Sequence, residues 1–304
     1  SASYCFAHPL TGGKQVVCES WRNMIAVGAN PIAITNCLNF GNPEKEKNMG
    51  EFVECLQGIG EACKYLDYPV VSGNVSFYNG TNKKNIFPTP VIGGVGLIKK
   101  LSKHIGHNFK HNNSILLLIG KTFGHLEQSV FLKEIYSINE GMPPEINLRN
   151  EKNNGECLLK LINKNLVLSS HDISTGGLIV ALAEMSIGSN IGAKISKPKR
   201  LTNSINYFFG EDQARYLIEI KNENFSKVDK ILRENNVFFD NIPVARRLIF
   251  IIVCQLLIHS LSSKSIEFII DVPALLTKTS KLSLIHISEP TRRTPISYAV
   301  FCLK

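Results

Sequence analysis

Apolar residues in the first hundred positions recur at two alternating spacings, one typical of helices and one typical of short strands. The pattern predicts a helix at residues 13–27, a strand at 31–38, a helix at 52–66, a strand at 68–71 and a glycine-rich strand at 90–97. This alternation indicates a compact α/β unit.

A second unit follows a polar segment at residues 99–113, which is rich in Lys, His and Asn and lacks apolar periodicity. The strands expected in it are 115–119, 166–168 and 216–220, and the helices are 128–136, 157–163 and 178–185. We therefore expect an α/β (α+β) protein of two domains, at residues 1–100 and 101–242, with no short-period repeat.

The chain has 304 residues, of which 44% are hydrophobic, and is long enough to bury sizeable cores. Its strongest apolar run, 248–258, contains Gln255 and is shorter than the roughly 18–20 residues that span a bilayer. The first residues lack the basic start and apolar stretch of a signal peptide. We expect no membrane partner and a cytoplasmic location.

Charge and cysteine usage bear on two further classes of protein. The net charge of +9 suggests nucleic-acid binding, but eight basic and only three acidic residues lie at 243–304, and the rest of the chain has a balance of only +4. The eight cysteines form no CxxC pair and no Cys/His spacing suited to zinc. We expect no nucleic-acid partner, and cysteines that are mostly reduced and buried.

Residues 72–76, Ser-Gly-Asn-Val-Ser, follow an expected strand, where α/β proteins usually gather ligand groups. Gly73 would let backbone N–H groups approach a phosphate, and Asn74 offers a side-chain oxygen to magnesium. A plain turn is the alternative, because Gly-Asn pairs are common in turns. The Asn-rich segment at 36–42 allows the same two interpretations.

Two polar segments of the second unit also carry candidate ligands. Asp172 lies between a buried strand and a helix, where an anion or magnesium could bind. The alternative is that Ser174 or Thr175 merely caps that helix. Glu211 lies in the polar run Gly-Glu-Asp-Gln, for which a solvated turn is the usual explanation. Neither a Walker A motif nor GxGxxG is present, so any ATP site belongs to another fold.

Six groups of motifs, in order along residues 4–242, together resemble the synthetase subunit of formylglycinamide ribonucleotide amidotransferase, also called phosphoribosylformylglycinamidine synthase. The motifs are GGKQVV at 12–17 with WRN at 21–23, LNFGNP at 38–43, VVSGNVS at 70–76, PTP at 88–90 with IGGVG at 92–96, HD at 171–172 with GGL at 176–178, and GEDQ at 210–213. Their number and order make the resemblance specific.

The resemblance implies the fold of the aminoimidazole ribonucleotide synthetase superfamily, whose full-length subunit repeats a pair of α/β domains twice. The motifs match the second pair, so the first pair and the opening of this one would be missing. In the family, ATP phosphorylates the amide oxygen of formylglycinamide ribonucleotide with magnesium, and ammonia then displaces phosphate to form the amidine in de novo purine biosynthesis. The implied partners are a glutaminase subunit that supplies ammonia, a small bridging subunit and the first half of the same polypeptide.

The same resemblance assigns roles to four residues. Gly73 matches an ATP contact, Asn74 a magnesium ligand and Ser76 a contact to the ribonucleotide substrate. Asn36 matches a second ATP contact, which is Asp in many relatives, so it would keep a hydrogen bond and lose a negative charge. The family's catalytic histidine, general base and most magnesium carboxylates lie in the missing half. No catalytic residue is therefore expected here, and the fragment should be inactive alone.

Asp172 and Glu211 occupy motifs that parallel ligand motifs of the missing half, so they suit either an auxiliary nucleotide site or a structural role. Two other functions are consistent with the residues. One is a structural nucleotide-binding half, which would retain ADP without turnover. The other is a related kinase or synthetase of the superfamily, such as selenophosphate synthetase or a hydrogenase-maturation enzyme, which would have a start codon just before residue 1.

The end of the chain does not follow the family pattern. Residues 282–292 resemble the in-frame translation of a transposase sequencing adapter, residues 296–303 resemble a translated flow-cell primer, and three residues separate the two, as an index would require. We therefore assign no function to residues 282–304. Residues 243–281 depart from the family where its final strands should begin, and we interpret them as doubtful, frameshifted coding sequence.

Overall fold

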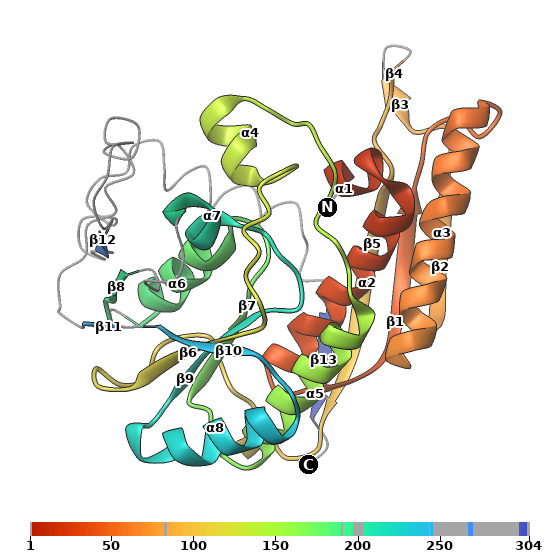
Figure 1. Cartoon of the computed structure of the whole chain (residues 1–304). Helices are drawn as coiled ribbons and strands as arrows, with labels where there is room; N and C mark the ends of the chain where they lie inside the picture. Colours follow the sequence, from red (N-terminus) through yellow and green to blue (C-terminus); the bar gives the residue numbers. More distant parts are fainter. Residues whose placement is uncertain are drawn as a thin grey trace.

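The structure is a computed structural model that describes most of the first 242 residues and three short strands beyond them. The described residues are 2–81, 84–189, 191–196, 203–242, 244–245, 267–269 and 298–302. They include two four-stranded sheets, with helices packed between and around them (Figure 1).

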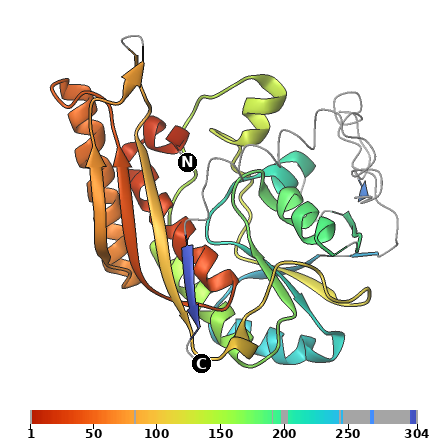
Figure 2. The same cartoon turned by 180° about the vertical axis from the view of Figure 1, so that it is seen from behind.

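The first sheet has the strand order β13-β5-β1-β2. The elements of this first unit are α1 (Ala2–Ala7), α2 (Pro9–Ala26), β1 (Asn30–Asn39), α3 (Glu46–Leu66), β2 (Val70–Ser76), the hairpin β3 (Gly80–Thr81) and β4 (Lys84–Asn85), and β5 (Thr89–Ile98). β1 runs parallel to β2 and antiparallel to β5. In the described part of the chain, helices cover one face of this sheet and leave the other open (Figure 2).

The second sheet has the order β10-β6-β9-β7, and its neighbouring strands are antiparallel. The elements of this second unit are η1 (Leu101–Lys103), β6 (Ile115–Ile119), α4 (Val130–Tyr136), α5 (Leu148–Asn163), β7 (Ser169–Asp172), α6 (Gly177–Ile187), β8 (Lys194–Ser196), α7 (Ser204–Phe209), β9 (Tyr216–Ile220), η2 (Asn222–Asn224), α8 (Phe225–Glu234) and β10 (Phe239–Ile242).

Residues beyond 242 enter the structure through three strands. β11 (Val244–Ala245) and β12 (Glu267–Ile269) pair with β8, and β13 (Tyr298–Cys302) runs parallel to β5 at the edge of the first sheet. The other residues of the doubtful segment and of the tail lie outside the described residues, and the frameshift and adapter interpretations stay predictions.

Both faces of the second sheet are buried, which explains why β6 is an unbroken apolar run. Leu117 and Ile119 pack into the core that is shared with α2 and α5, whereas Leu116 and Leu118 pack into a second core with α6 and α7. Successive side chains of a strand point to opposite faces, so one strand supplies two cores.

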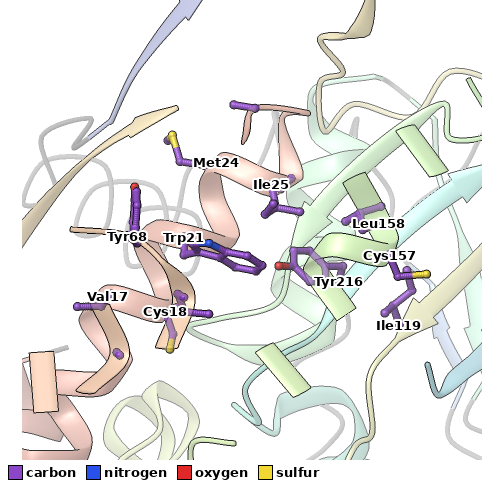
Figure 3. Close-up of a cluster of buried hydrophobic side chains, with 14 of the residues drawn as sticks. Val17, Cys18, Trp21, Met24, Ile25, Tyr68, Ile119, Cys157, Leu158 and Tyr216 are labelled. Carbon is purple, nitrogen blue, oxygen red and sulfur yellow. The ribbon is translucent and has the colours of Figure 1, made fainter. Parts of the chain in front are cut away.

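Helix α2 connects the two units, because it packs against the first sheet on one side and against α5 and β7 on the other. Its Trp21 lies in the shared core beside Leu158 and Tyr216 of the second unit (Figure 3). The close approach of α5 requires Gly155, because a Cβ there would lie 2.2 Å from the Trp21 ring. The hydrophobic core therefore continues from one unit into the other.

Several element boundaries differ from the sequence prediction for identifiable reasons. α2 begins at Pro9 rather than Gly13, because the His8 side chain accepts the Thr11 N–H and proline suits the first helical position. Similarly, α5 begins at Leu148, well before the predicted residue 157, because the polar face of its first turns is buried against the other unit.

The strand predicted at residues 166–168 is wrong. Leu166 and Val167 are buried in the connection that precedes β7, and the polar residues that follow them pair with β9. Ser169 pairs there because its hydroxyl donates to the buried carboxylate of Glu219 at 2.8 Å. Periodicity also does not predict α1, α7, α8 or β10, which are all short.

Gly155→Ala should destabilise the chain despite the higher helix propensity of alanine, because the new methyl group overlaps the Trp21 ring. We expect a loss of about 1–3 kcal/mol in the free energy of unfolding, the usual cost of overpacking a core. Denaturant unfolding followed by tryptophan fluorescence would measure it.

The matched control is Gly60→Ala on α3, where a Cβ meets nothing within 4 Å. That change should stabilise the chain by up to about 1 kcal/mol. Equal effects of the two substitutions would show that Trp21 does not restrict residue 155.

Candidate functional site

The segment expected to be a loop at residues 72–76 is instead the end of β2, the outer strand of the first sheet. The parallel register places Asn36 opposite Gly73, and Asn74 and Ser76 follow along the same strand. Ligand sites of α/β proteins commonly lie at the carboxyl ends of parallel strands. The four residues assigned by the family resemblance are therefore neighbours in the structure.

Gly73 leaves a space that the side chain of Asn36 occupies. A Cβ at position 73 would lie 1.9 Å from Oδ1 of Asn36, so a larger residue cannot be accommodated unless the amide moves. Because β2 is the last strand of its sheet among the described residues, its outer backbone edge faces no other strand. A ligand can therefore approach the backbone of Gly73 and the amide of Asn36 together.

Asn74 and Ser76 lie on the opposite face of β2 from Gly73, because side chains alternate along a strand. The Nδ2 of Asn74 donates to the Ser76 hydroxyl at 3.5 Å. This bond uses the amide nitrogen, so the amide oxygen is the atom of Asn74 that is suited to bind a cation. The predicted contacts thus divide between two faces that meet at the open edge of β2.

The residues at the end of β2 could hold magnesium only together with ligands from elsewhere. Among the described residues, no group of three or more His, Cys, Asp or Glu side chains is placed to hold a metal. Magnesium requires a near-octahedral shell of oxygen ligands, and Asn74 supplies one neutral oxygen. The other ligands would have to come from nucleotide phosphates, water or another polypeptide segment.

Asp172 is buried at the end of β7 and already has partners. In the amide orientation that satisfies both groups, the Asn23 nitrogen donates to both carboxylate oxygens at 3.2 Å. The imidazole of His171 lies 3.6 Å from Asp172 Oδ1, and its other nitrogen lies 2.9 Å from Glu184. Burial raises the pKa of Asp172, and the charges of His171 and Arg22 oppose this shift.

Glu211 is also buried, so the expectation of a solvated turn is wrong. Its carboxylate accepts the backbone N–H of Val130 at 2.9 Å, the N–H of Gly176 at 2.8 Å and the hydroxyl of Tyr4. Val130 and Gly176 are at the starts of α4 and α6, where backbone N–H groups lack helical partners. Burial raises the pKa of Glu211, and these three donors oppose the shift.

The carboxylate of Glu211 takes the place of the local helix cap that was one of the two interpretations of residues 170–177. Ser174 and Thr175 do not cap α6; the N-cap residue is Gly176, with φ at 79° and no capping side chain of its own. The next residue, Asp212, accepts backbone N–H groups of residues 123–125 at 2.9–3.1 Å. Both carboxylates therefore satisfy buried backbone donors.

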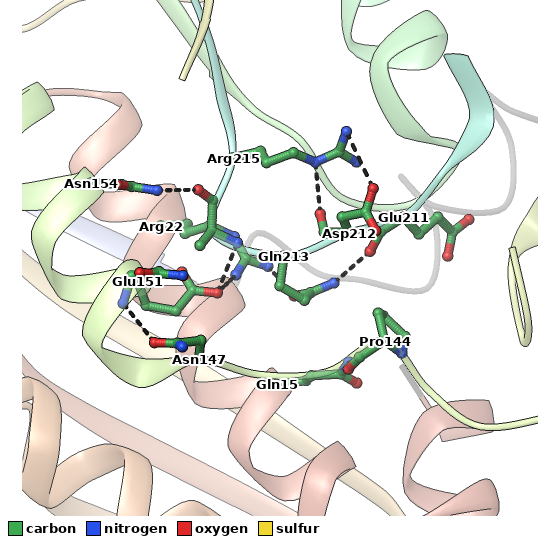
Figure 4. Close-up of polar contacts among 12 residues, drawn as sticks. Gln15, Arg22, Pro144, Asn147, Glu151, Asn154, Glu211, Asp212, Gln213 and Arg215 are labelled. Carbon is green, nitrogen blue, oxygen red and sulfur yellow. Dashed lines mark hydrogen bonds and ion pairs between the residues drawn. The ribbon is translucent and has the colours of Figure 1, made fainter. Parts of the chain in front are cut away.

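A buried ion pair joins the two units and was not predicted from the sequence (Figure 4). Arg22 donates to Glu151 at 2.5 Å and to the side-chain oxygen of Gln213 at 2.7 Å. Glu151 also accepts the Ala214 N–H at 2.9 Å. Burial raises the pKa of Glu151, and Arg22 opposes the shift. The sequence feature that could have indicated this ion pair is a charged residue, Arg22, directly after Trp21 in a helix with apolar periodicity.

A small pocket lies beside this ion pair, at the boundary between the units. Tyr4 and Glu19 line it from the first unit, and Thr175 and Gln213 line it from the second. Gln15 also lines the pocket, and its buried Oε1 has no hydrogen-bond partner among the residues that the structure describes. Neither Asn36 nor the residues of β2 reach this pocket, so the structure keeps it separate from the predicted ATP contacts.

Comparisons with known proteins agree with this architecture. The family described as AIR synthase related protein matches residues 1–98 with its N-terminal domain and residues 113–242 with its C-terminal domain. Phosphoribosylformylglycinamidine synthase subunit PurL of Pelagibacter ubique (strain HTCC1062) is 60% identical over 242 residues, which are 80% of this chain and 33% of the relative. The same subunit of Bradyrhizobium diazoefficiens is 52% identical over 225 residues, 74% of this chain and 31% of the relative.

Solved structures show the same fold. Thermotoga maritima PurL complexed with FGAR superposes with a TM-score of 0.63 at 18% identity, covering 80% of this chain and 40% of that one. The complex of T. maritima PurL with ATP gives a TM-score of 0.59 at 19% identity, covering 79% of this chain and 38% of that one.

The chain therefore belongs to the AIR synthase related family. Its curated relatives named above are PurL subunits of phosphoribosylformylglycinamidine synthase, and the chain spans about a third of their length. The resemblance drawn from the motifs and the α+β fold are thereby confirmed. Within the described part of the chain, no helix has both the length and the apolar character needed to cross a membrane.

The environment of His171 predicts that its contribution to folding stability depends on pH. Burial alone would lower the pKa of His171, but the hydrogen bond to Glu184 and the charge of Asp172 outweigh it and raise the pKa to about 9. Because the folded pKa is above its ordinary value, this contribution to stability is complete below about pH 6.5 and is lost as pH rises towards 9.

Glu184→Gln should lower the pKa of His171, because it removes the carboxylate that accepts from the imidazole. An NMR titration of the imidazole Cε1–H resonance would measure the change. Glu223→Gln, which alters a carboxylate beside Lys221, should leave the titration unchanged. An unaltered His171 pKa in the Glu184 variant would show that Glu184 does not hold the proton.

Proposed function

We propose that this chain is the second half of the synthetase subunit of phosphoribosylformylglycinamidine synthase, an ATP-dependent carbon–nitrogen ligase of de novo purine biosynthesis. The observation that carries the proposal is the parallel register that places Asn36 opposite Gly73. The 60% identity with a PurL subunit supports it, as do the fold neighbours complexed with ATP and with FGAR.

In this proposal, the chain contributes half of a site that binds ATP, magnesium and formylglycinamide ribonucleotide. Asn36 and Gly73 contact the nucleotide, Asn74 supplies a magnesium ligand, and the Ser76 hydroxyl binds the ribonucleotide. Magnesium-bound ATP supplies the phosphoryl group that activates the amide oxygen of the substrate. The residues of this half bind and orient, because none of the four is an acid or base suited to proton transfer.

The open edge of β2 is suited to contact the first half of the same polypeptide. Val70, Val71 and Val75 are 43%, 68% and 46% exposed on this strand. An outer strand with exposed valines is a surface that soluble proteins normally cover. We propose that the first half of the polypeptide covers it and completes the magnesium shell. A glutaminase subunit supplying ammonia, a small bridging subunit and a cytoplasmic location belong to the same proposal.

For Asp172 and Glu211 we propose a structural role rather than an auxiliary nucleotide site. The support is that Asp172 accepts from Asn23, while Glu211 accepts two backbone N–H groups and the hydroxyl of Tyr4. A carboxylate with this many donors loses them if it turns towards a ligand, and unsatisfied buried donors cost free energy.

Asn74→Ala, made in the full-length enzyme that contains this sequence, should raise the magnesium requirement or the KM for ATP. We expect a change of roughly tenfold, which corresponds to about 1.4 kcal/mol of binding free energy. Steady-state kinetics at varied magnesium and ATP would measure it.

A matched control is Asn222→Ala, which removes an exposed amide of the second unit. It should leave both constants unchanged. Kinetics of the Asn74 variant that equal those of the wild type would refute the assignment of Asn74.

If Asp172 and Glu211 have a structural role, this chain should not bind ADP tightly. The carboxylate oxygens of both residues already accept hydrogen bonds from the protein. Isothermal titration calorimetry of the chain with ADP and magnesium would test this. Tight binding that Asp172→Asn abolishes and Glu223→Gln preserves would contradict it and favour a structural nucleotide.

A further inference from the structure

Tyr78 has a backbone conformation that residues with large side chains rarely adopt. Its φ is 60°, in the left-handed region, and among the described residues it is the one aromatic residue with a positive φ. It lies two positions after Ser76, the last residue of β2, and its side chain is 62% exposed. Glycine or asparagine would adopt this conformation more readily, so the turn itself does not require a tyrosine. Residues held in such conformations concentrate at sites that bind ligands.

The residues on either side hold Tyr78 in this conformation. The side chain of Asn79 donates to the carbonyl oxygen of Ser76 at 2.8 Å. The Phe77 ring packs edge-on against Phe52, with the ring centroids 5.0 Å apart. Because both neighbours are anchored to the rest of the unit, the Tyr78 side chain between them turns outwards. The core therefore does not depend on the phenol ring.

The Tyr78 side chain contacts the loop that follows β1. Its backbone N–H donates to the carbonyl oxygen of Gly41 at 3.1 Å, and its hydroxyl donates to Oε1 of Glu44 at 3.3 Å. Asn42 positions this carboxylate, because its Oδ1 accepts the Glu44 N–H at 2.8 Å. β1 and β2 are parallel, so the loops after them leave the sheet at the same end, where the hairpin β3–β4 also lies (Figure 1). The phenol and the carboxylate are thus exposed together at the strand end that carries Ser76.

A phenol beside a carboxylate is suited to bind sugar hydroxyls. The charge of Glu44 raises the pKa of Tyr78, so the phenol stays protonated and can donate a hydrogen bond as well as accept one. The carboxylate of Glu44 accepts only. A sugar hydroxyl is both a donor and an acceptor and matches the two groups, whereas the negative charge of Glu44 would repel a phosphate.

We propose that Tyr78 and Glu44 bind the ribose hydroxyls of the ribonucleotide substrate, beside the contact made by Ser76. The inference rests on the proposed function, which assigns the substrate contact to Ser76. A ribose hydroxyl donates to the Glu44 carboxylate and accepts from the Tyr78 phenol. The left-handed turn holds the phenol in place before the substrate arrives, so less conformational freedom is lost on binding.

Steady-state kinetics of the full-length enzyme that contains this sequence test the proposal. Tyr78→Phe keeps the ring and removes the hydroxyl, so it should raise the KM for formylglycinamide ribonucleotide by roughly two- to tenfold, the usual effect of losing one hydrogen bond. Glu44→Gln should also raise it, because a carboxylate accepts hydrogen bonds more strongly than an amide. Both variants should keep the wild-type kcat and KM for ATP.

Tyr78→Gly separates substrate binding from folding. It removes the phenol and relieves the left-handed backbone, so this variant should unfold at a higher temperature than the wild type and still have a raised KM for the ribonucleotide. The matched control is Ser137→Gly, at an exposed residue that ends α4 with φ at 57°. It should also unfold at a higher temperature, with no change in KM. A less stable Tyr78→Gly beside a more stable Ser137→Gly would show that the phenol holds the turn, contrary to the inference.

An unchanged ribonucleotide KM in Tyr78→Phe and Tyr78→Gly would overturn the proposal. Ser76→Ala then shows whether the proposed function fails with it, because a raised KM in that variant keeps the substrate contact at the end of β2 and an unchanged one removes it. A raised KM for ATP alone would place the ribose of the nucleotide on this pair, and a lowered ribonucleotide KM in Glu44→Gln would indicate a phosphate. Either result would overturn the assignment to the ribose of the substrate.

Discussion

The ion pair between Arg22 and Glu151 is the constraint on which the arrangement of the two units depends. Removing two charges from water costs several kcal/mol per ion, and close pairing offsets this only when further hydrogen bonds complete the shell. Gln213 and the Ala214 N–H provide such bonds, while Arg22 Nε and Glu151 Oε2 have no hydrogen-bond partner among the described residues. All of them exist only when α2, α5 and the polar run before β9 are in place together, so the pair determines how the units meet.

The candidate ATP contacts follow from a different part of the structure. Asn36 and Gly73 are adjacent because β1 and β2 are parallel, and β2 is accessible because it is the outer strand. The same exposure that lets a ligand reach Gly73 leaves valines of β2 uncovered. Ligand binding and association with a further segment therefore involve one edge, which is consistent with a site shared between two halves of a longer polypeptide.

Sequence periodicity predicts those elements whose burial is local and regular. The run at residues 115–119 and the strand at 216–220 are recovered because both are buried on their two faces. Residues 72–76 are strand rather than loop, because pairing with β1 overrides the turn preference of Gly-Asn. Glu211 and Asp212 of the polar run at 210–215 are buried because their side chains bind distant backbone groups, and no local pattern contains that information.

For the candidate site, spacing alone favours a plain turn over a phosphate-binding loop at Gly73. The family resemblance identifies the residues, and the structure adds that Asn36 lies beside them. The sequence does not show that Asn74 and Gly73 face opposite ways, because that depends on how far β2 extends. The pairing of Arg22 with Glu151 is likewise a contact between residues 129 positions apart.

The contact of Gly155 with Trp21 has a consequence for how this protein can change over generations. Gly155 belongs to the second unit and Trp21 to the first, and position 155 has no room for a side chain while the indole of Trp21 is in place. A larger residue at 155 becomes tolerable only after the indole has been replaced by something smaller. Recombination that exchanges one unit for that of a divergent relative would break this match, so the two units are expected to be inherited as a pair.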